Sequence, residues 1–288
     1  MRAIRLLTLL VLMMPLLTAI AVEPARLVLV IDDIGNHPRA DRRAVNLPGP
    51  VAMAILPGTP NAARMANIAH AQGKPVMVHL PMQAYPDSPL GPFALRMDMD
   101  ETGFRQTVRD ALAAVPHAQG LNNHMGSLLT RHPGAMDWLM DELNTGSGLF
   151  FLDSRTTAKT LTEEFARKHE VPWLRRHVFL DDDPQPEAVA RQWQAALEYA
   201  RQRGEVVVIG HPYPATLALL ERELLQLPED IELVAPDKLL PAIDSFYPAD
   251  NNRCVSGQPS QADAFEFSAT CSLPATKIEP LKRSPGSG

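Results

Sequence analysis

The sequence predicts an α/β fold, a distorted (β/α) barrel of seven or eight mostly parallel strands followed by a disordered C-terminal tail. Three observations carry this prediction. Short apolar runs alternate with helical patterns over residues 26–246. Several runs are continuously apolar and β-branched, as in parallel strands covered on both faces. Residues 247–288 are rich in Pro, Ser, Gly, Asp and Asn without periodicity, which is typical of disorder.

Eight segments qualify as strands. Seven are apolar by composition, whereas 120–124 is placed only by the rhythm of strand and helix. The predicted strands are residues 27–31, 51–56, 75–80, 120–124, 149–152, 177–180, 205–210 and 231–234. Seven or eight strand–helix units in one chain of this length indicate a barrel that is incomplete or distorted.

Helices fill the gaps between these strands, and their ends carry local signals. Thr59, with Pro60 behind it, and Asp100 are predicted N-caps. Thr160 and Glu163 form a capping-box pattern. The helix from Pro186 should stop at Gly204. The predicted helices span residues 59–73, 100–115, 160–169 and 186–203.

The N-terminus resembles a targeting segment. Arg2 and Arg5 precede an apolar run, and Ala19-Ile20-Ala21 fits a small-x-small cleavage site. We therefore expect residues 1–21 to be a signal peptide and the mature protein to be periplasmic or extracellular. The alternative is an uncleaved N-terminal anchor. No later segment is long and apolar enough for a transmembrane span.

Composition narrows the function classes. The net charge is −6 and no basic block occurs, so nucleic acid is not an expected partner. The only two cysteines, Cys254 and Cys271, lie in the tail, which excludes a thiol nucleophile or a cysteine-rich zinc site in the body. Whether Cys254 and Cys271 form a disulfide stays open.

Two acids end the first predicted strand. Asp32 and Asp33 should point to opposite sides of that strand, so that one binds a metal while the other accepts a proton. Asp is also common in turns and helix caps, which is the alternative interpretation.

Three histidines follow or end strand-like runs: His79, His124 and His211. A neutral imidazole at a strand end is a good zinc ligand. His124 lies among Asn123 and other polar residues that are costly to bury without a task. The prolines after His211 would stiffen its loop, as a general acid requires. Each histidine alone is also compatible with a structural role.

Further polar residues follow later strands. Arg155 could pair with an active-site carboxylate, hold an anionic substrate group or form a structural salt bridge. Asp153 and Ser154 could orient a ligand, and Asp181 could point into the site. The carboxyl ends of barrel strands converge on one face, so these residues should gather there.

Seven segments carry a resemblance to a known family: VIDDIG, AILPGTP, VMVHLPMQ, GLNNHMGS, FLDSRTT, FLDD and VIGHPYP. In this order and spacing, over residues 26–243, the chain resembles the divergent polysaccharide deacetylases, a branch of the polysaccharide deacetylase (carbohydrate esterase family 4-like) superfamily. The resemblance implies a distorted barrel and a metal held by one Asp and two His. It makes Asp32 the catalytic base, Asp33 a metal ligand, His79 part of the second motif and His211 the general acid.

One departure from the family pattern affects the metal site. The second motif of these enzymes has two histidines four residues apart, whereas Gln83 stands four residues after His79. We expect His124, on the next strand, to replace the missing ligand. The expected ligands are thus Asp33, His79 and His124, and the expected metal is zinc. Gln83, Asn123, Asp153, Ser154, Arg155 and Asp181 are expected around the site or against the substrate.

These expectations define two hypotheses. The first is a metal-dependent hydrolase that removes N- or O-acetyl groups from an envelope polysaccharide, with the glycan as its partner. The second is a catalytically inactive metal- or glycan-binding protein of the same fold. A third, weaker hypothesis is a scaffold that acts through its tail.

Overall fold

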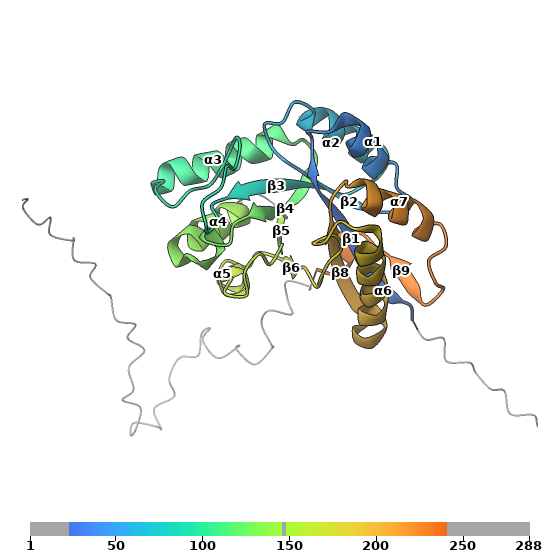
Figure 1. Ribbon diagram of the computed structural model, residues 1–288. Helices are drawn as coiled ribbons and strands as arrows, with labels where there is room; N and C mark the ends of the chain where they lie inside the picture. Colours follow the sequence, from blue (N-terminus) through green and yellow to red (C-terminus); the bar gives the residue numbers. More distant parts are fainter. Residues whose placement is uncertain (1–22, 146–147, 241–288) are drawn as a thin grey trace, which may run out of the picture. The chain divides into compact units, whose positions relative to one another are not determined.

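The computed structural model describes residues 23–145 and 148–240, and within them nine parallel strands form one sheet (Figure 1). The strand order is β6-β5-β4-β3-β2-β1-β8-β7, with β9 paired to the start of β1. The strands are β1 (Ala25–Ile34), β2 (Ala52–Ile55), β3 (Val76–Met82), β4 (Ala118–Met125), β5 (Phe150–Asp153), β6 (Trp173–Arg175), β7 (Val178–Phe179), β8 (Glu205–Gly210) and β9 (Ile231–Leu233). The predicted α/β barrel of parallel strands is confirmed.

Seven α-helices in the described residues lie around the strands (Figure 1). They are α1 (Pro38–Val45), α2 (Ala62–Ala71), α3 (Glu101–Ala114), α4 (Pro133–Thr145), α5 (Thr162–Lys168), α6 (Pro186–Arg203) and α7 (Pro214–Glu223). Short 3₁₀ turns occupy Leu129–Arg131 and Pro236–Lys238. No helix of this part of the chain has the length and apolarity that crossing a bilayer requires.

The sheet curls strongly because its two edge strands are neighbours in sequence, although they do not pair with each other. Only Arg176 and His177 separate β6 from β7, although these strands lie at opposite ends of the strand order. The backbone N–H of Arg176 donates to Asp153 O of β5 (2.9 Å), and that of His177 donates to Val207 O of β8 (2.9 Å). A two-residue link spans at most about 11 Å between flanking Cα atoms, so the two edges of the sheet lie close together and the sheet forms an incomplete barrel.

Side-chain parity divides the buried apolar residues into two cores. In β1, Leu27, Leu29 and Ile31 belong to the large core under the helices, whereas Val28 and Val30 belong to a smaller core inside the barrel. Successive strand residues point to opposite faces, so the inward-facing positions of each strand can be counted along the chain. In β3 and β4 this alternation continues as far as His79 and His124.

Helix ends test the local predictions. Asp100 caps α3 as predicted, accepting from the N–H of Gly103 (2.8 Å), and α6 ends at Gly204 with φ of 79°. The predicted cap at Thr59 is wrong, because its hydroxyl donates to Leu56 O (2.8 Å) and α2 starts without a side-chain cap. The predicted capping box at Thr160 is also wrong: its hydroxyl accepts from the N–H of Thr162, two residues on.

Three predictions fall on residues outside the described part of the chain. These are the signal peptide at 1–21, the tail at 247–288, and the open question of a bond between Cys254 and Cys271. They stay predictions. One observed strand, β6, was not among the predicted ones, because its three residues, Trp173–Arg175, are too few to show a period.

His177, the residue before β7, contacts β8 through its side chain. Its titration should make the stability of this contact depend on pH. Its Nδ1 accepts from the N–H of Val207 (2.9 Å), while the ring stacks on Tyr199. Burial, together with the charges of Arg175 and Arg155, lowers the pKa of His177 to about 4. His177 therefore becomes protonated near pH 6.5 in the unfolded chain, but only near pH 4 in the folded chain.

We expect the free energy of unfolding to fall as the pH drops from 6.5 to 4, by at most about 3 kcal/mol from this residue. The variant His177→Asn keeps an acceptor near the Nδ1 position but does not titrate. Its unfolding free energy should depend less on pH across this interval, as measured by urea denaturation at several pH values. Parallel pH profiles of the two proteins would contradict the assignment.

Candidate metal centre

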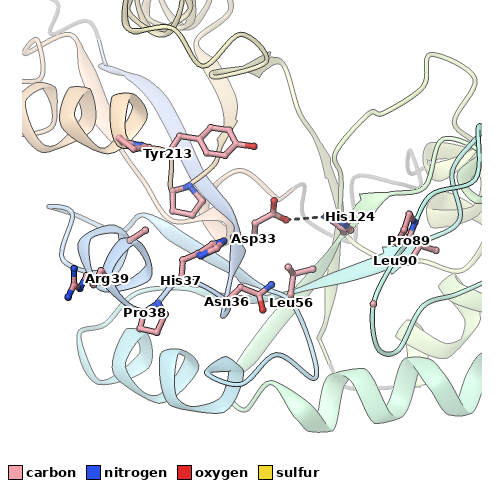
Figure 2. A pocket seen from close by; sticks show the side chains of 14 residues that line it. Asp33, Asn36, His37, Pro38, Arg39, Leu56, Pro89, Leu90, His124 and Tyr213 are labelled. Atoms are coloured by element: carbon pink, nitrogen blue, oxygen red, sulfur yellow. Dashed lines mark ion pairs between the residues drawn. The ribbon is translucent and has the colours of Figure 1, made fainter.

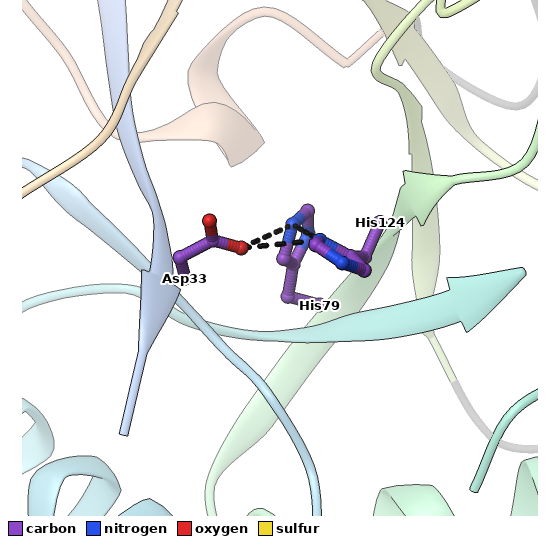
Figure 3. Close-up of side chains that lie close together, drawn as sticks. All are labelled: Asp33, His79 and His124. Atoms are coloured by element: carbon purple, nitrogen blue, oxygen red, sulfur yellow. Dashed lines mark hydrogen bonds and ion pairs between the residues drawn. The ribbon is translucent and has the colours of Figure 1, made fainter. Parts of the chain in front are cut away.

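Three side chains from separate strands meet at the carboxyl end of the barrel (Figure 3). Asp33 Oδ1 lies 3.3 Å from His79 Nε2 and 3.1 Å from His124 Nδ1. The two ring nitrogens lie 3.0 Å apart. One oxygen and two nitrogens thus face a common point. The sequence-based convergence of Asp33, His79 and His124 is present in the structure.

Strand parity explains why two of these residues face inward. His79 follows the inward-facing Met77 by two residues, so its ring enters the barrel. Residues 79 and 122 are register partners between β3 and β4, and Pro81 is the partner of His124. The same alternation brings Asn122 and His124 of β4 to the inner side.

Asp33 enters the site by a different route. It directly follows the inward-facing Asp32, so regular alternation would turn it away from the barrel. Its backbone instead has a φ of 59°, and the pairing of β1 with β2 shifts register there. Asp tolerates this left-handed conformation better than most residues. Asp41 holds the following turn, accepting from the N–H groups of Gly35 and His37 (both 3.1 Å).

Asn122 sets the orientation and the tautomer of His79. Its Nδ2 donates to Asp32 Oδ1 (2.8 Å), so its Oδ1 must face His79 Nδ1 (2.8 Å). In the neutral imidazole, Nδ1 then carries the hydrogen and the lone pair of Nε2 points at Asp33 and His124. Partners of this kind orient metal-binding histidines. Asn122 was not among the predicted site residues, although it shares the inward parity of His124.

The electrostatic environment favours charge separation within the cluster. Burial pushes the pKa of Asp33 upward, but the imidazoles of His124 and His79 outweigh burial and hold that pKa far below its usual range. Burial lowers the pKa of His79, yet Asp32 and Asp33 outweigh it and raise the pKa. The carboxylates thus attract positive charge to this point, whether a proton or a metal cation.

The donor set fits a divalent cation. Asp33 Oδ1 is buried, and none of the described residues gives it a hydrogen bond of regular geometry. Ligands about 2.0–2.1 Å from a tetrahedral zinc ion lie about 3.3–3.4 Å apart, close to the observed 3.0–3.3 Å. Two imidazoles and one carboxylate also match the ligands that catalytic zinc sites use.

Asp32 lies beside the cluster but is not one of its three converging ligands. Its side chain is almost fully buried, and Oδ2 lies 3.6 Å from His79 Nε2. Burial raises the pKa of Asp32, although the nearby His79 and His211 oppose this rise. The donated hydrogen bond from Asn122 holds Oδ1, so Oδ2 stays available as an acceptor.

His211 faces the cluster from the end of β8, with Nε2 3.9 Å from Asp33 Oδ2. Asp181 fixes it: Oδ1 lies 2.9 Å from His211 Nδ1, and Oδ2 accepts from the N–H of His211 (2.6 Å) and the hydroxyl of Thr216 (2.7 Å). Burial alone would lower the pKa of His211, but Asp181 and Asp32 raise it to about 9. The ring of His211 is therefore a positively charged imidazolium at neutral pH.

Two further predicted residues brace the strand ends. Ser154 Oγ accepts from Asn122 Nδ2 (3.2 Å), and the N–H of Ser154 donates to Asn123 Oδ1 (2.8 Å). Asn123 Nδ2 in turn donates to Met125 O (2.7 Å). These bonds tie the end of β5 to the end of β4, which carries His124.

Other predicted residues point elsewhere. Asp153 has the outward parity of β5, and its Oδ1 accepts from the N–H of Arg155 (2.7 Å). Gln83 Oε1 accepts from the N–H of Met97 (2.8 Å) and supports the 95–97 segment. No carboxylate of the described residues lies within ion-pair distance of the Arg155 guanidinium.

Two cavities meet at the cluster. The larger, of about 930 Å³, is mostly apolar and includes Asp33 and His124 in its wall; Figure 2 shows Leu56, Leu90 and Tyr213 around it. The smaller, of about 400 Å³, includes Asp32, His79 and His211 in its wall and shares His124 with the larger one. Its wall includes Arg176 and Phe179. Neither residue was predicted for the site: Arg176 lies in the two-residue link between β6 and β7, and Phe179 belongs to the two-residue strand β7.

Comparison with known proteins agrees with this architecture. The divergent polysaccharide deacetylase family model matches residues 29–240, and the chain therefore belongs to this family. The matched region contains every residue of the cluster, together with Asp32, Asp181 and His211. The family match thus covers the barrel and the whole candidate site.

Similar proteins leave the activity unassigned. An uncharacterized protein of Haemophilus influenzae is 38% identical over 224 residues, covering 78% of this chain and 80% of its own. The uncharacterized protein YibQ of Escherichia coli K12 is 37% identical over 228 residues, which cover 78% of this chain and 71% of YibQ. The crystal structure of an uncharacterized protein from Agrobacterium tumefaciens C58 superposes with a TM-score of 0.71 at 20% sequence identity. The match covers 76% of this chain and 90% of the other, and it supports the fold.

Proposed function

We propose that the protein is a metal-dependent carbohydrate deacetylase that hydrolyses N- or O-acetyl groups on an envelope polysaccharide. The observation that carries this proposal is the placement of Asp32 and His211 beside one cluster of Asp33, His79 and His124. One cation site between a proton acceptor and a proton donor suits acyl hydrolysis. Membership of the family supports the same reaction class.

Asp33, His79 and His124 would hold the cation. A bound divalent cation, zinc in our proposal, would supply Lewis acidity that polarises the acetyl carbonyl and acidifies water at the site. Asp32 accepts a proton from the attacking water through Oδ2, the oxygen that Asn122 leaves free. The water oxygen forms a bond to the acetyl carbon.

His211 completes the reaction as general acid. When the bond between the acetyl carbon and the sugar nitrogen or oxygen breaks, the leaving atom takes a proton from the His211 imidazolium. Its raised pKa keeps that proton available at neutral pH. Asp181 holds the ring in place through Nδ1, which leaves Nε2 as the donor. The products are acetate and the free amine or hydroxyl of the glycan.

The site of action in this proposal is outside the cytoplasm, in the periplasm or beyond it. This part rests on the leader-like residues 1–21 alone. An envelope glycan is the acetylated polymer that an exported deacetylase would meet. Export would be tested by fractionating cells that express the full-length chain.

Acetate release tests the proposed activity. Protein stripped with a chelator and reloaded with zinc should release acetate from acetylated oligosaccharides, and the stripped protein should not. We expect one equivalent of zinc per chain to restore full activity. Chelated protein that keeps its activity would contradict metal dependence.

The alternative, a non-catalytic metal- or glycan-binding protein, makes a different prediction in the same assay. Gln83 at the second-motif position is the observation that favours it. Zinc-loaded protein that binds acetylated oligosaccharides but releases no acetate from N- or O-acetylated probes would favour this alternative over the enzyme.

A further inference from the structure

The smaller cavity at the cluster is lined by two arginines. Arg155 and Arg176 share this space of about 400 Å³ with Asp32, His211 and Asp182. The hydrolysis proposed above uses Asp32 and His211, and gives the arginines no task. The inference below rests on that proposed function and concerns the substrate that the same site accepts.

Arg176 is held rigidly at the cavity wall. Its Nε donates to Ser154 O (2.6 Å) and its Nη2 to Arg155 O (3.1 Å), while the guanidinium lies 4.5 Å from the ring centroid of Phe179. These contacts fix the plane of the group and leave Nη1 without an acceptor among the described residues. Among the described residues, no carboxylate lies within ion-pair distance of Arg176. A fixed guanidinium with a free edge is prepared for a planar anion.

Arg155 adds a second cation from a fixed backbone position. Its φ is 52°, and its N–H is bound to Asp153 Oδ1 (2.7 Å). The residue is exposed, so its guanidinium can approach a ligand in the cavity without breaking a bond to the described residues. Burial is the main reason why the pKa of Arg176 is lowered. The charge of Arg155 lowers this pKa further, whereas Asp32 and Asp153 act in the opposite direction. An anion between the two arginines would relieve their repulsion.

The acids of the cavity limit the charge of the ligand. Asp182 is exposed at the wall and pairs with neither arginine within ion-pair distance, and Asp32 lies deeper. A doubly charged phosphate would be repelled by both carboxylates more strongly than a singly charged carboxylate. The two arginines and the two carboxylates together therefore favour a monovalent, planar anion that matches the edge of the guanidinium group.

We propose that this cavity binds the carboxylate of an acidic acetylated glycan, with Arg176 as the preoriented donor and Arg155 as the second cation. The acetylated sugar would then lie over the cluster, and a sugar that carries a carboxylate would lie against the arginines. The substrate class is thus an acidic polysaccharide rather than a neutral one.

Binding measurements test this proposal independently of turnover. The probes are an O-acetylated oligomannuronate, which carries carboxylates, and chitotetraose, which is neutral and of similar length. Calorimetric titration of the zinc-loaded protein should show at least about 10-fold tighter binding of the acidic probe at low salt. The difference should shrink as the salt concentration rises.

Charge variants identify the groups responsible. Arg155→Gln breaks no side-chain hydrogen bond among the described residues, so it should fold normally. It should weaken binding of the acidic probe by roughly 3-fold or more, and Arg176→Lys should weaken it by about 10-fold, because lysine lacks the fork. Asp182→Asn should strengthen acidic binding. The control Arg39→Gln removes the same charge from the wall of the larger cavity and should leave acidic binding unchanged.

The outcomes separate this inference from the proposed function. Equal binding of both probes, or equal losses in Arg155→Gln and Arg39→Gln, would overturn the acidic-glycan site. Arginine-dependent binding without acetate release from any acetylated probe would support the site and contradict the deacetylase activity instead.

Discussion

Replacing Asp33 with asparagine should reduce zinc affinity by more than about 100-fold, beyond the 10–100-fold loss typical of residues that only support a metal ligand. The substitution removes the negative charge of the cluster and leaves the shape of the side chain nearly unchanged. Asparagine also tolerates the left-handed backbone at this position, where φ is 59°. The protein should therefore keep its fold while it loses its metal.

The measurement is a calorimetric zinc titration of chelator-treated protein, with circular dichroism to check folding. Asp182→Asn is the matched control, because it removes the same charge from an exposed position near the site and should bind zinc like the unmodified protein. Asp33→Asn protein that still binds one zinc ion with unchanged affinity would show that this carboxylate is not a ligand.

Replacing Asp32 with asparagine should lower kcat for acetate release by about 10²–10⁴-fold, the usual contribution of a general base. The amide cannot accept the proton of the attacking water. Asn122 can still bond to the carbonyl oxygen of the new side chain, so the orientation of His79 should persist. Zinc affinity should change far less than kcat.

The contrast between the two variants separates the two roles. Asp33→Asn should lose metal and activity together, whereas Asp32→Asn should hold one zinc ion per chain and still bind the glycan. Steady-state acetate release and zinc content, measured on the same samples, give this comparison. Asp32→Asn protein with unmodified kcat would remove Asp32 as the base.

The sequence reveals most of the fold because the barrel strands are apolar on both faces. The β8 segment, residues 205–210, is recognisable by composition alone, and the helix before it ends at Gly204 as predicted. The edge strand β6 contains three residues, too few to show a period, whereas β7 falls within the predicted strand 177–180. The places of β6 and β7 in the sheet depend on contacts of the link between them with β5 and β8, which the local sequence does not encode.

The candidate site was accessible from sequence where strand parity decides it. His79 and His124 end up on the inner side because inward positions recur every second residue, and the same count identifies Asn122. Asp33 could not be placed this way, since a left-handed residue and a shift in pairing turn it inward. Arg176 depends on the fold of a two-residue link and on backbone acceptors that only the structure brings near it.

A crystal structure of the zinc-soaked protein, with anomalous scattering recorded at the zinc absorption edge, tests the central claim most directly. We expect one strong anomalous peak within about 2.0–2.2 Å of Asp33 Oδ1, His79 Nε2 and His124 Nδ1. A zinc ion bound elsewhere in the barrel, or a structure from a zinc-saturated crystal in which these three atoms do not share an ion, would contradict it.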